Sequence, residues 1–380
     1  MPDPRLLDQG SVLELELEGR PTRFHALWLR DNARDPATRD AGNGQRLITL
    51  LDIAADVRID QAEWDEATLN LRFEPEGRWI GFDRDWLRSH VYDDRPIRDA
   101  GWTDETIERW DAAAAAAVPV EHYDALLSDP QRLLGWLATL CRYGFARLTG
   151  APPTQGVAEG VAGLFGFIRE TNYGRTFDVR SEVAPSNLAY TNLGLQAHTD
   201  NPYRDPVPGL QILTCIANDV EGGASLLVDG FKIVERLQTE MPRGFELLSS
   251  RCARFDYAGA NGVRLRSKRP LIELGCDGEL IALRFNSRSA AAFTDIPFDE
   301  MADYYAAYRR MAELVEDERF AFRFRLAPVD LFVVDNMRVL HARSAFLDHG
   351  DRWLQGCYVD KDGMLSTLAG LQDRFDGIGA

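Results

Sequence analysis

The chain has 380 residues, 45% of them hydrophobic, and a formal net charge of −17 at pH 7. That length supports a large core and two domains. The negative charge argues against nucleic acid as a partner, because its phosphates would be repelled, and it gives no reason to expect binding to an anionic membrane. No apolar run approaches the roughly 20 residues of a membrane span, signal-peptide features are absent, and the five scattered cysteines lack CxxC spacing, so we expect a cytoplasmic protein with reduced thiols.

A small β-rich domain is predicted for residues 1–105. Apolar and polar side chains alternate with period two in short runs separated by Gly, Asp and Asn, which is typical of antiparallel strands. The predicted strands are residues 12–17, 46–51 and 69–73. Trp86 to His90 is expected to belong to a short helix.

A connecting segment, residues 106–122, is predicted between this domain and the rest of the chain. Six consecutive alanines, Ala112 to Ala117, favour a helix but bury little surface. We interpret them as the end of a connecting helix within residues 101–118, after which Pro119 turns the chain.

Residues 123–380 mix strands with amphipathic helices and are predicted to form the larger domain. Helices are expected at residues 123–143, 156–168 and 298–315. Strands are expected at residues 144–148, 209–216, 225–228, 280–285, 320–325, 331–334 and 354–359. This pattern favours a mainly β fold with flanking helices, a distorted double-stranded β-helix or jelly roll, which can hold a ligand between its two sheets.

The most informative motif is the tripeptide His198-Thr199-Asp200, followed much later in the chain by His341. An imidazole and a carboxylate two positions apart on an extended strand point the same way, and an imidazole from a distant strand completes a face of three ligands. That set is the 2-His-1-carboxylate triad of non-haem Fe(II) oxygenases, which leaves positions open for a cosubstrate and O2. The three residues are therefore predicted metal ligands and catalytic residues.

Arg352 follows His341 on the next predicted strand. A planar guanidinium can hold the far carboxylate of a dicarboxylate cosubstrate in bidentate fashion. Ser225, which follows Gly222-Gly223, can add a hydroxyl hydrogen bond to the same carboxylate. A surface salt bridge is the alternative for Arg352 alone, but its place after the two histidines and the aspartate favours 2-oxoglutarate.

Four motifs, HTD at 198–200, GGASLLVDGF at 222–231, FVVDNMRVLHAR at 332–343 and DRWLQGCYVD at 351–360, give the chain a resemblance to the Fe(II)/2-oxoglutarate dioxygenases related to taurine dioxygenase. More narrowly, it resembles the gamma-butyrobetaine dioxygenase family, which also matches at FHALWLRDN, YGRTFDV and NLAY, starting at Phe24, Tyr173 and Asn187. The resemblance covers nearly the whole chain. It implies Fe(II), 2-oxoglutarate and O2 as cofactor and cosubstrates, and a homodimer.

The N-terminal domain departs from that family in one place. The family domain typically binds zinc through three closely spaced cysteines after WLRDN and a later histidine. Here residues 33–38 read ARDPAT, without cysteine. His90 alone cannot hold a structural zinc ion. We therefore expect no structural zinc, and stoichiometric zinc in a metal analysis would contradict this.

The family resemblance also implies a substrate pocket for a small quaternary ammonium compound. A trimethylammonium group has no N–H to donate, so an aromatic cage is the physical solution. The cage falls on Tyr173, Phe177, Tyr190 and Tyr358, and the amides of Asn187 and Asn286 meet the far carboxylate, with Arg288 close by. The expected reaction is hydroxylation of a methylene, most directly of gamma-butyrobetaine to L-carnitine. Within the same family, 2-trimethylaminoethylphosphonate and trimethyllysine are alternatives.

Three alternatives of other classes remain open. A non-catalytic betaine-binding protein would keep the cage without the metal, and an iron-free protein that binds ligand would support it. A hydrolytic or zinc enzyme would leave Arg352 without a role, and a test of dependence on 2-oxoglutarate would decide. A relative acting on an anionic sulfonate would have no use for an aromatic cage.

Overall fold

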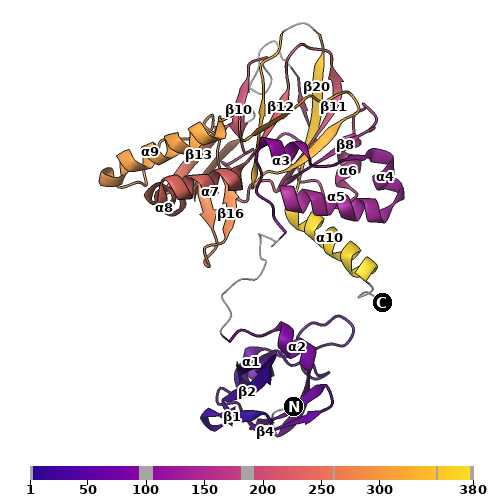
Figure 1. Cartoon of the computed structure of the whole chain (residues 1–380), viewed down its shortest axis with the longest axis vertical. Coiled ribbons are helices and arrows are strands. Elements are labelled where there is room, and N and C mark those ends of the chain that lie inside the picture. The colour runs from indigo at the N-terminus through magenta and orange to yellow at the C-terminus, as the bar shows by residue number, and fades with distance from the viewer. Residues whose placement is uncertain (1–2, 94–105, 181–191, 260–261, 348–349, 377–380) are drawn as a thin grey trace. The chain divides into compact units, whose positions relative to one another are not determined.

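The structure is a computed structural model in which residues 3–93, 106–180, 192–259, 262–347 and 350–376 are described (Figure 1). The chain divides into two compact units, residues 1–99 and 100–380. The finer boundaries predicted from the sequence, at residues 105 and 122, stay predictions.

The N-terminal unit contains two three-stranded antiparallel sheets, as the alternating pattern predicts. Leu13, Leu15 and Leu17 all point into a core shared by both sheets, because alternate residues of a strand face the same side. One sheet contains β1 (Arg5–Leu7), β2 (Val12–Leu17) and β3 (Arg20–His25), and the other β4 (Arg58–Asp65), β5 (Thr68–Glu74) and β6 (Arg78–Asp83). The short helices are α1 (Ala26–Asp31), α2 (Arg84–Ser89), η1 (Asp8–Gly10) and η2 (Leu50–Asp52).

The predicted strand at residues 46–51 is wrong. Part of it forms the 3-10 helix η2, which begins with a capping box in which Thr49 and Asp52 each bind the other's backbone. The leucines that suggested a strand, Leu47, Leu50 and Leu51, are exposed, and Leu51 is 95% exposed. Local capping therefore outweighed the strand preference of a short apolar run.

The larger unit is built on two sheets that pack face to face, which confirms the predicted jelly roll. The larger sheet has the order β7-β8-β18-β11-β20-β9 and the smaller one β10-β19-β12-β17. The larger sheet contains β7 (Val120–His122), β8 (Phe145–Thr149), β18 (Leu331–Asp335), β11 (Leu210–Asn218), β20 (Arg352–Val359) and β9 (Phe177–Val179). The smaller sheet contains β10 (Leu195–His198), β19 (Val339–Arg343), β12 (Ser225–Asp229) and β17 (Ala321–Phe324). One buried cluster joins side chains of both sheets, including Leu213, Phe332 and Leu354 from the larger and Leu227, Phe322 and Val339 from the smaller.

Helices cover the outer sides of this pair of sheets. Helices α4 (Tyr123–Ser128), α5 (Pro130–Tyr143), α6 (Val157–Ala162) and α10 (Lys361–Asp376) share a core with the larger sheet. Helices α7 (Gly230–Glu240), α8 (Pro242–Ser250) and α9 (Phe298–Val315) gather on the other side in Figure 1. Two hairpins accompany them. One is formed by β13 (Cys252–Ala258) and β14 (Arg264–Pro270), and the other by β15 (Ile272–Leu274) and β16 (Leu280–Leu283).

Three helix predictions differ from the structure. The helix expected at residues 156–168 is the shorter α6, which ends at Ala162. The helix expected at residues 123–143 is two helices, because Asp129 caps α5 through a hydrogen bond from the Gln131 amide and Pro130 takes its first position. The alanine run forms only α3 (Ala112–Ala116), and the described residues before it, 106–111, are not helical. Asp111 starts α3 by accepting hydrogen bonds from two backbone amides.

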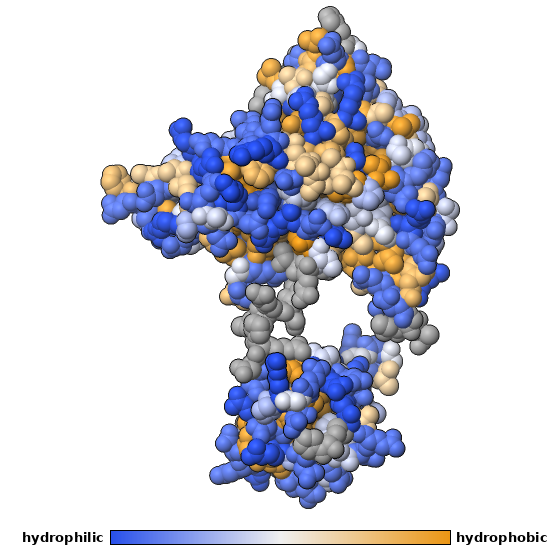
Figure 2. Space-filling view, viewed as in Figure 1, coloured by the Kyte–Doolittle hydropathy of each residue, from blue (hydrophilic) through white to orange (hydrophobic). Residues whose placement is uncertain are grey.

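The outer surface carries mostly hydrophilic side chains on the face seen in Figure 2, with apolar side chains in separate patches. Among the described helices, none has the combination of length and apolar character needed to span a bilayer.

Candidate active site

A cavity of about 400 Å³ opens in the larger unit, and residues of both sheets line it. The three predicted metal ligands lie on its wall, together with Arg352 and Ser225. The jelly roll therefore brings together residues that are far apart in the sequence, as its topology predicts.

Strand pairing places the two histidines side by side. β10 and β19 are antiparallel, and His198 and His341 are direct partners in the register, with ring centroids 4.4 Å apart. The position of Asp200 differs from the sequence prediction, which put it on the same extended strand as His198. Strand β10 ends at His198, and Asp200 lies just beyond it. Asn201, with φ at +53°, turns the chain immediately after it.

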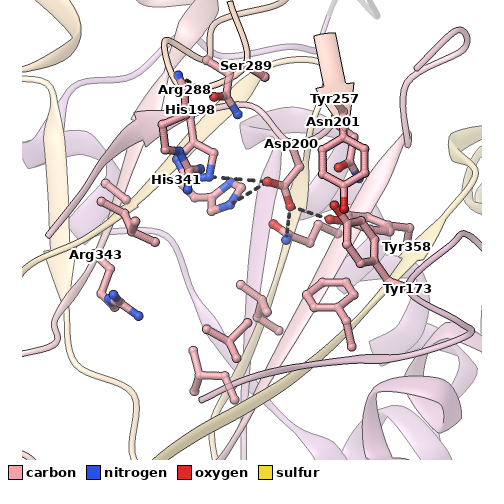
Figure 3. Close-up of a pocket in the computed structure, with 18 of the residues that line it drawn as sticks. Tyr173, His198, Asp200, Asn201, Tyr257, Arg288, Ser289, His341, Arg343 and Tyr358 are labelled. Carbon is pink, nitrogen blue, oxygen red and sulfur yellow. Dashed lines mark hydrogen bonds and ion pairs between the residues drawn. The ribbon is translucent and has the colours of Figure 1, made fainter. Parts of the chain in front are cut away.

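Both imidazoles face one oxygen of Asp200 (Figure 3). His198 Nε2 is 3.4 Å from Asp200 Oδ1, and His341 Nε2 is 3.8 Å from the same atom. The His198 Nδ1 donates to the carbonyl of Gln196 at 2.7 Å, which leaves Nε2 as the lone-pair nitrogen. The potential ligand atoms of His198, Asp200 and His341 all lie within 4.8 Å of one another. In the described part of the chain, no other group of three or more His, Cys, Asp or Glu side chains lies close enough together to hold a metal ion.

The charge state of the cluster suits a metal ion. Burial alone would raise the pKa of Asp200. The two imidazoles and the hydrogen bond from the Tyr358 hydroxyl have the larger combined effect and hold this pKa well below its usual value. Burial, with His198 beside it, lowers the pKa of His341 to about 3. An ionised carboxylate with neutral imidazoles is the form in which these residues bind metal, and the donor set of two nitrogens and one oxygen fits Fe(II).

Three further residues hold Asp200 in place. Its Oδ2 accepts hydrogen bonds from Gln211 Nε2 at 2.6 Å and from the Tyr358 hydroxyl at 2.7 Å. Its backbone amide donates to Asn336 Oδ1 at 2.6 Å, and the Asn336 amide group donates back to its carbonyl at 3.0 Å. Gln211 and Asn336 were not predicted from the sequence, because their roles depend on register and on a turn between sheets.

Arg352 and Ser225 line the same cavity. Arg352 is 5% exposed, and its Nε has no hydrogen-bond partner among the described residues. Its Nη2 donates a long hydrogen bond to the Gly223 carbonyl at 3.4 Å. A Cβ on Gly223, whose φ is +64°, would come within 3.0 Å of that Nε, so glycine makes room for the guanidinium. A buried cation with an unfilled donor fits the distal carboxylate of 2-oxoglutarate.

Arg343 is a second buried guanidinium at this part of the cavity. It lies beside Ser225 in the register of β19 and β12, and its Nη2 donates to the Leu193 carbonyl at 2.7 Å. Burial, reinforced by Arg352, lowers the pKa of Arg343 to about 10. The sequence contained a signal for it, because residues two apart on a strand face the same side and Arg343 is two residues after His341.

Aromatic side chains form the rest of the lining. The predicted cage residues Tyr173, Phe177 and Tyr358 all line the cavity, and Phe177 packs on Tyr358 with ring centroids 4.9 Å apart. Tyr203 and Tyr257, which the sequence analysis did not identify, stack on each other at 4.7 Å. The Tyr173 and Tyr203 hydroxyls are 3.0 Å apart.

The predicted anion-binding residues fall into two groups. Asn286 and Arg288 line the cavity. The Asn286 amide group donates to the Thr199 carbonyl at 3.1 Å and its oxygen accepts from the Arg288 backbone amide at 3.1 Å, so much of its capacity is already used within the protein. Asn187 and Tyr190 lie outside the described residues.

The expected absence of structural zinc stays a prediction. In the N-terminal unit the His90 ring stacks on Trp86 with centroids 4.3 Å apart, and its Nδ1 lies 2.7 Å from the Trp86 carbonyl oxygen. These contacts hold the ring against its own helix.

Comparisons with known proteins point in one direction. The sequence profile of the family described as "Taurine catabolism dioxygenase TauD, TfdA family" matches residues 109–358. The chain is 36% identical to the gamma-butyrobetaine dioxygenase of Pseudomonas sp. (strain AK-1) over 93% of this chain and 92% of that protein. It is 30% identical to the mitochondrial trimethyllysine dioxygenase of Bos taurus over 94% and 86%, and 29% identical to the gamma-butyrobetaine dioxygenase of Homo sapiens over 93% and 92%.

Proposed function

This chain belongs to the TauD, TfdA family of Fe(II)- and 2-oxoglutarate-dependent dioxygenases, and we propose that it hydroxylates a methylene carbon of a small trimethylammonium compound. Gamma-butyrobetaine is the substrate that we propose, with L-carnitine as the product. The observation that carries the proposal is the aromatic lining of the cavity that also holds the His198, Asp200 and His341 cluster.

The aromatic lining suits a quaternary ammonium head group. Such a cation has no N–H and gains from the electron-rich faces of aromatic rings, by about 2 kcal/mol or more when both partners are desolvated. Tyr173, Phe177, Tyr257 and Tyr358 supply such rings within one cavity. Two relatives are named for gamma-butyrobetaine and for trimethyllysine, and both of these compounds carry a trimethylammonium group, which agrees with a cage as the shared feature.

The chain's own residues provide binding and orientation. His198, Asp200 and His341 would hold Fe(II), and Arg352 with Ser225 would hold the distal carboxylate of 2-oxoglutarate. When bound, the metal and this cosubstrate supply the oxygen chemistry that hydroxylates a C–H bond. The cage fixes the cation at one side of the cavity and so presents one methylene, rather than an N-methyl group, toward the metal-ligating end.

The anionic end of the substrate distinguishes two candidates. Asn286, with Asn187 from outside the described residues, would meet a carboxylate as neutral donors. Arg288 lies on the rim, lines the cavity and is exposed. A guanidinium there favours a more highly charged head group, which makes 2-trimethylaminoethylphosphonate the second candidate substrate.

A turnover assay across four compounds tests the proposal. Purified protein with Fe(II), 2-oxoglutarate and O2 is given gamma-butyrobetaine, 2-trimethylaminoethylphosphonate, trimethyllysine or 5,5-dimethylhexanoate, the isostere of the first in which an uncharged tert-butyl group replaces the trimethylammonium cation. We expect the highest kcat/KM for gamma-butyrobetaine, with hydroxylated product equal to succinate. We expect a kcat/KM lower by roughly tenfold or more for the tert-butyl isostere, because it loses the attraction between cation and rings.

Each other outcome changes a specific part of the proposal. Preference for the phosphonate or for trimethyllysine replaces the substrate but keeps the cage. Equal turnover of the tert-butyl isostere removes the cation-binding cage from the proposal. Binding of gamma-butyrobetaine without any turnover by the iron-loaded protein supports the non-catalytic alternative. The expected homodimer is a separate proposal, and light scattering tests it.

A further inference from the structure

We propose that Gln211 and Tyr358 are positioning residues that hold Asp200 as a one-oxygen metal ligand. They bind its Oδ2 from the larger sheet, while its Oδ1 faces the two histidines of the smaller sheet. The carboxylate would then connect the two layers of the jelly roll, and the geometry of the metal site would depend on both.

The two donors form a matched pair. Gln211 on β11 and Tyr358 on β20 are direct partners in the antiparallel register, so their side chains lie next to each other on one face of the larger sheet. Both are nearly buried, at 2% and 5% exposed. Their hydrogen bonds to Asp200 Oδ2, at 2.6 and 2.7 Å, converge on a single atom, as Figure 3 shows for Tyr358.

Gln211 is oriented toward Asp200 at some cost to its own hydrogen bonding. An ionised carboxylate can only accept hydrogen bonds, so the amide NH2 group of Gln211 must face it. The Gln211 Oε1 is then buried without a partner among the described residues. Buried polar groups in folded proteins are normally paired, and this arrangement favours a role directed at Asp200 over a purely structural one.

The remaining freedom of Asp200 is rotation of its carboxylate. Asn336, which is 1% exposed and lies in the turn between β18 and β19, binds the amide and the carbonyl of Asp200 and so fixes its backbone. A carboxylate that is free to rotate can present both oxygens to a metal. With Oδ2 occupied by two donors, only Oδ1 is left for the metal, and a coordination position is kept for other ligands.

Tyr358 would therefore have two separable parts. Its ring packs against Phe177 and belongs to the proposed cage, whereas its hydroxyl belongs to the metal site. Tyr358→Phe keeps the ring and removes the hydroxyl. The substitution thus distinguishes a positioning role from a role in the cage alone.

The test measures metal binding without any organic substrate, so its result does not depend on the substrate proposed above. Co(II) alone is titrated into the apo forms of wild type, Gln211→Met, Tyr358→Phe and the double variant, by calorimetry and by visible absorption. We expect each single variant to bind Co(II) roughly 10- to 100-fold more weakly, which is the usual effect of removing a group that orients a metal ligand. We also expect an altered absorption spectrum, and a double variant weaker than either single one.

Two matched controls separate this effect from general damage. Gln355→Met removes a buried glutamine of β20 that binds the Gly156 amide and Asp178 instead. Tyr304→Phe removes a buried hydroxyl in α9 that has no recorded partner in the described part of the chain. Both controls should bind Co(II) within about twofold of wild type, since neither residue lines the cavity.

Two outcomes would overturn the proposal. If Tyr358→Phe and Gln211→Met bind Co(II) with wild-type affinity and spectrum, Asp200 does not need these donors. If the Gln355→Met control weakens binding as much as Gln211→Met does, the effect comes from loosening of the sheet. Thermal unfolding of each apo variant shows that the proteins compared are folded.

Discussion

The two ends of the cavity differ in how far the protein itself fills their hydrogen-bonding capacity. At the metal end, Asp200 accepts two side-chain hydrogen bonds at Oδ2, and its backbone is bound by Asn336. At the cosubstrate end, Arg352 is buried but has an Nε without a partner within the described residues. A buried cation without an anion is costly, so this end is complete only when a ligand supplies the anion.

The difference predicts that the two ends fail in different ways. Loss of a metal-ligating side chain should abolish turnover at any concentration of 2-oxoglutarate, because the added cosubstrate cannot replace that side chain. Loss of the unpaired arginine should raise the concentration of 2-oxoglutarate that the enzyme needs while leaving the metal site intact.

Replacement of a metal ligand should have the largest effect. In His198→Ala the cluster keeps one imidazole and one carboxylate, and we expect 2-oxoglutarate turnover to fall by a factor on the order of a thousand or more, because the metal supplies several kcal/mol of stabilisation. Succinate formation with and without gamma-butyrobetaine measures the loss. His122→Asn is the control, since His122 caps α4 and asparagine keeps a capping acceptor. Substrate-stimulated turnover in His198→Ala would refute the triad.

Replacement of Arg352 should have a smaller effect that excess cosubstrate can overcome. Arg352→Met removes one partner of a buried charge pair, which costs at least about 2 kcal/mol, so we expect the KM for 2-oxoglutarate to rise roughly thirtyfold. Binding of Co(II) should stay close to wild type. Arg236→Met, which breaks an exposed ion pair with Glu240, is the control.

Arg343 provides the sharpest alternative to this assignment. Its guanidinium already donates to the Leu193 carbonyl, so we expect Arg343→Met to raise the same KM less than Arg352→Met does. The reverse order would move the cosubstrate carboxylate from Arg352 to Arg343.

Replacement of one aromatic residue of the cage should change the KM for gamma-butyrobetaine by roughly a factor of ten. Phe177→Leu keeps an apolar side chain but removes a ring face, and we expect the KM for gamma-butyrobetaine to rise about tenfold while that for 5,5-dimethylhexanoate changes little. Phe324→Leu, on β17 and away from the lining of the cavity, is the control. An equal change in KM for gamma-butyrobetaine and for its tert-butyl isostere would mean that Phe177 acts only through packing.

The sequence predicted the parts of this site that depend on residue type and local periodicity. The two histidines, Asp200 and Arg352 are residue types with few other uses in such an order, whereas the short strands β10 and β19 that bear the histidines were not among the predicted strands. The jelly roll followed from many short strands with few helices. Several strands of the larger unit, such as β11 and β18, lie within a residue or two of their predicted positions.

The missing parts depend on tertiary contacts that the chain order does not contain. Gln211 acts only because the register places it opposite Tyr358, and a shift of one residue would turn it to the other face. Asn336 acts because the turn between the sheets reaches Asp200. Tyr257 reaches the cavity from a hairpin outside both sheets. No periodicity in the sequence marks these positions.

The smallest predicted effect concerns Tyr304, whose buried hydroxyl can be compared with the Arg352 Nε. Tyr304, like Arg352, is buried with a polar atom that has no partner in the described part of the chain, but it lies in the core beneath α9 and not in the cavity. An unpaired hydroxyl in a core costs about 1 kcal/mol, so Tyr304→Phe should raise the melting temperature by roughly 2 °C and leave both KM values unchanged. Thermal unfolding measures the shift, and Tyr305→Phe, on the exposed side of α9, should give none. A lower melting temperature would mean that the hydroxyl is hydrogen-bonded in the folded protein, and the unpaired Nε of Arg352 would then be weaker support for a ligand site.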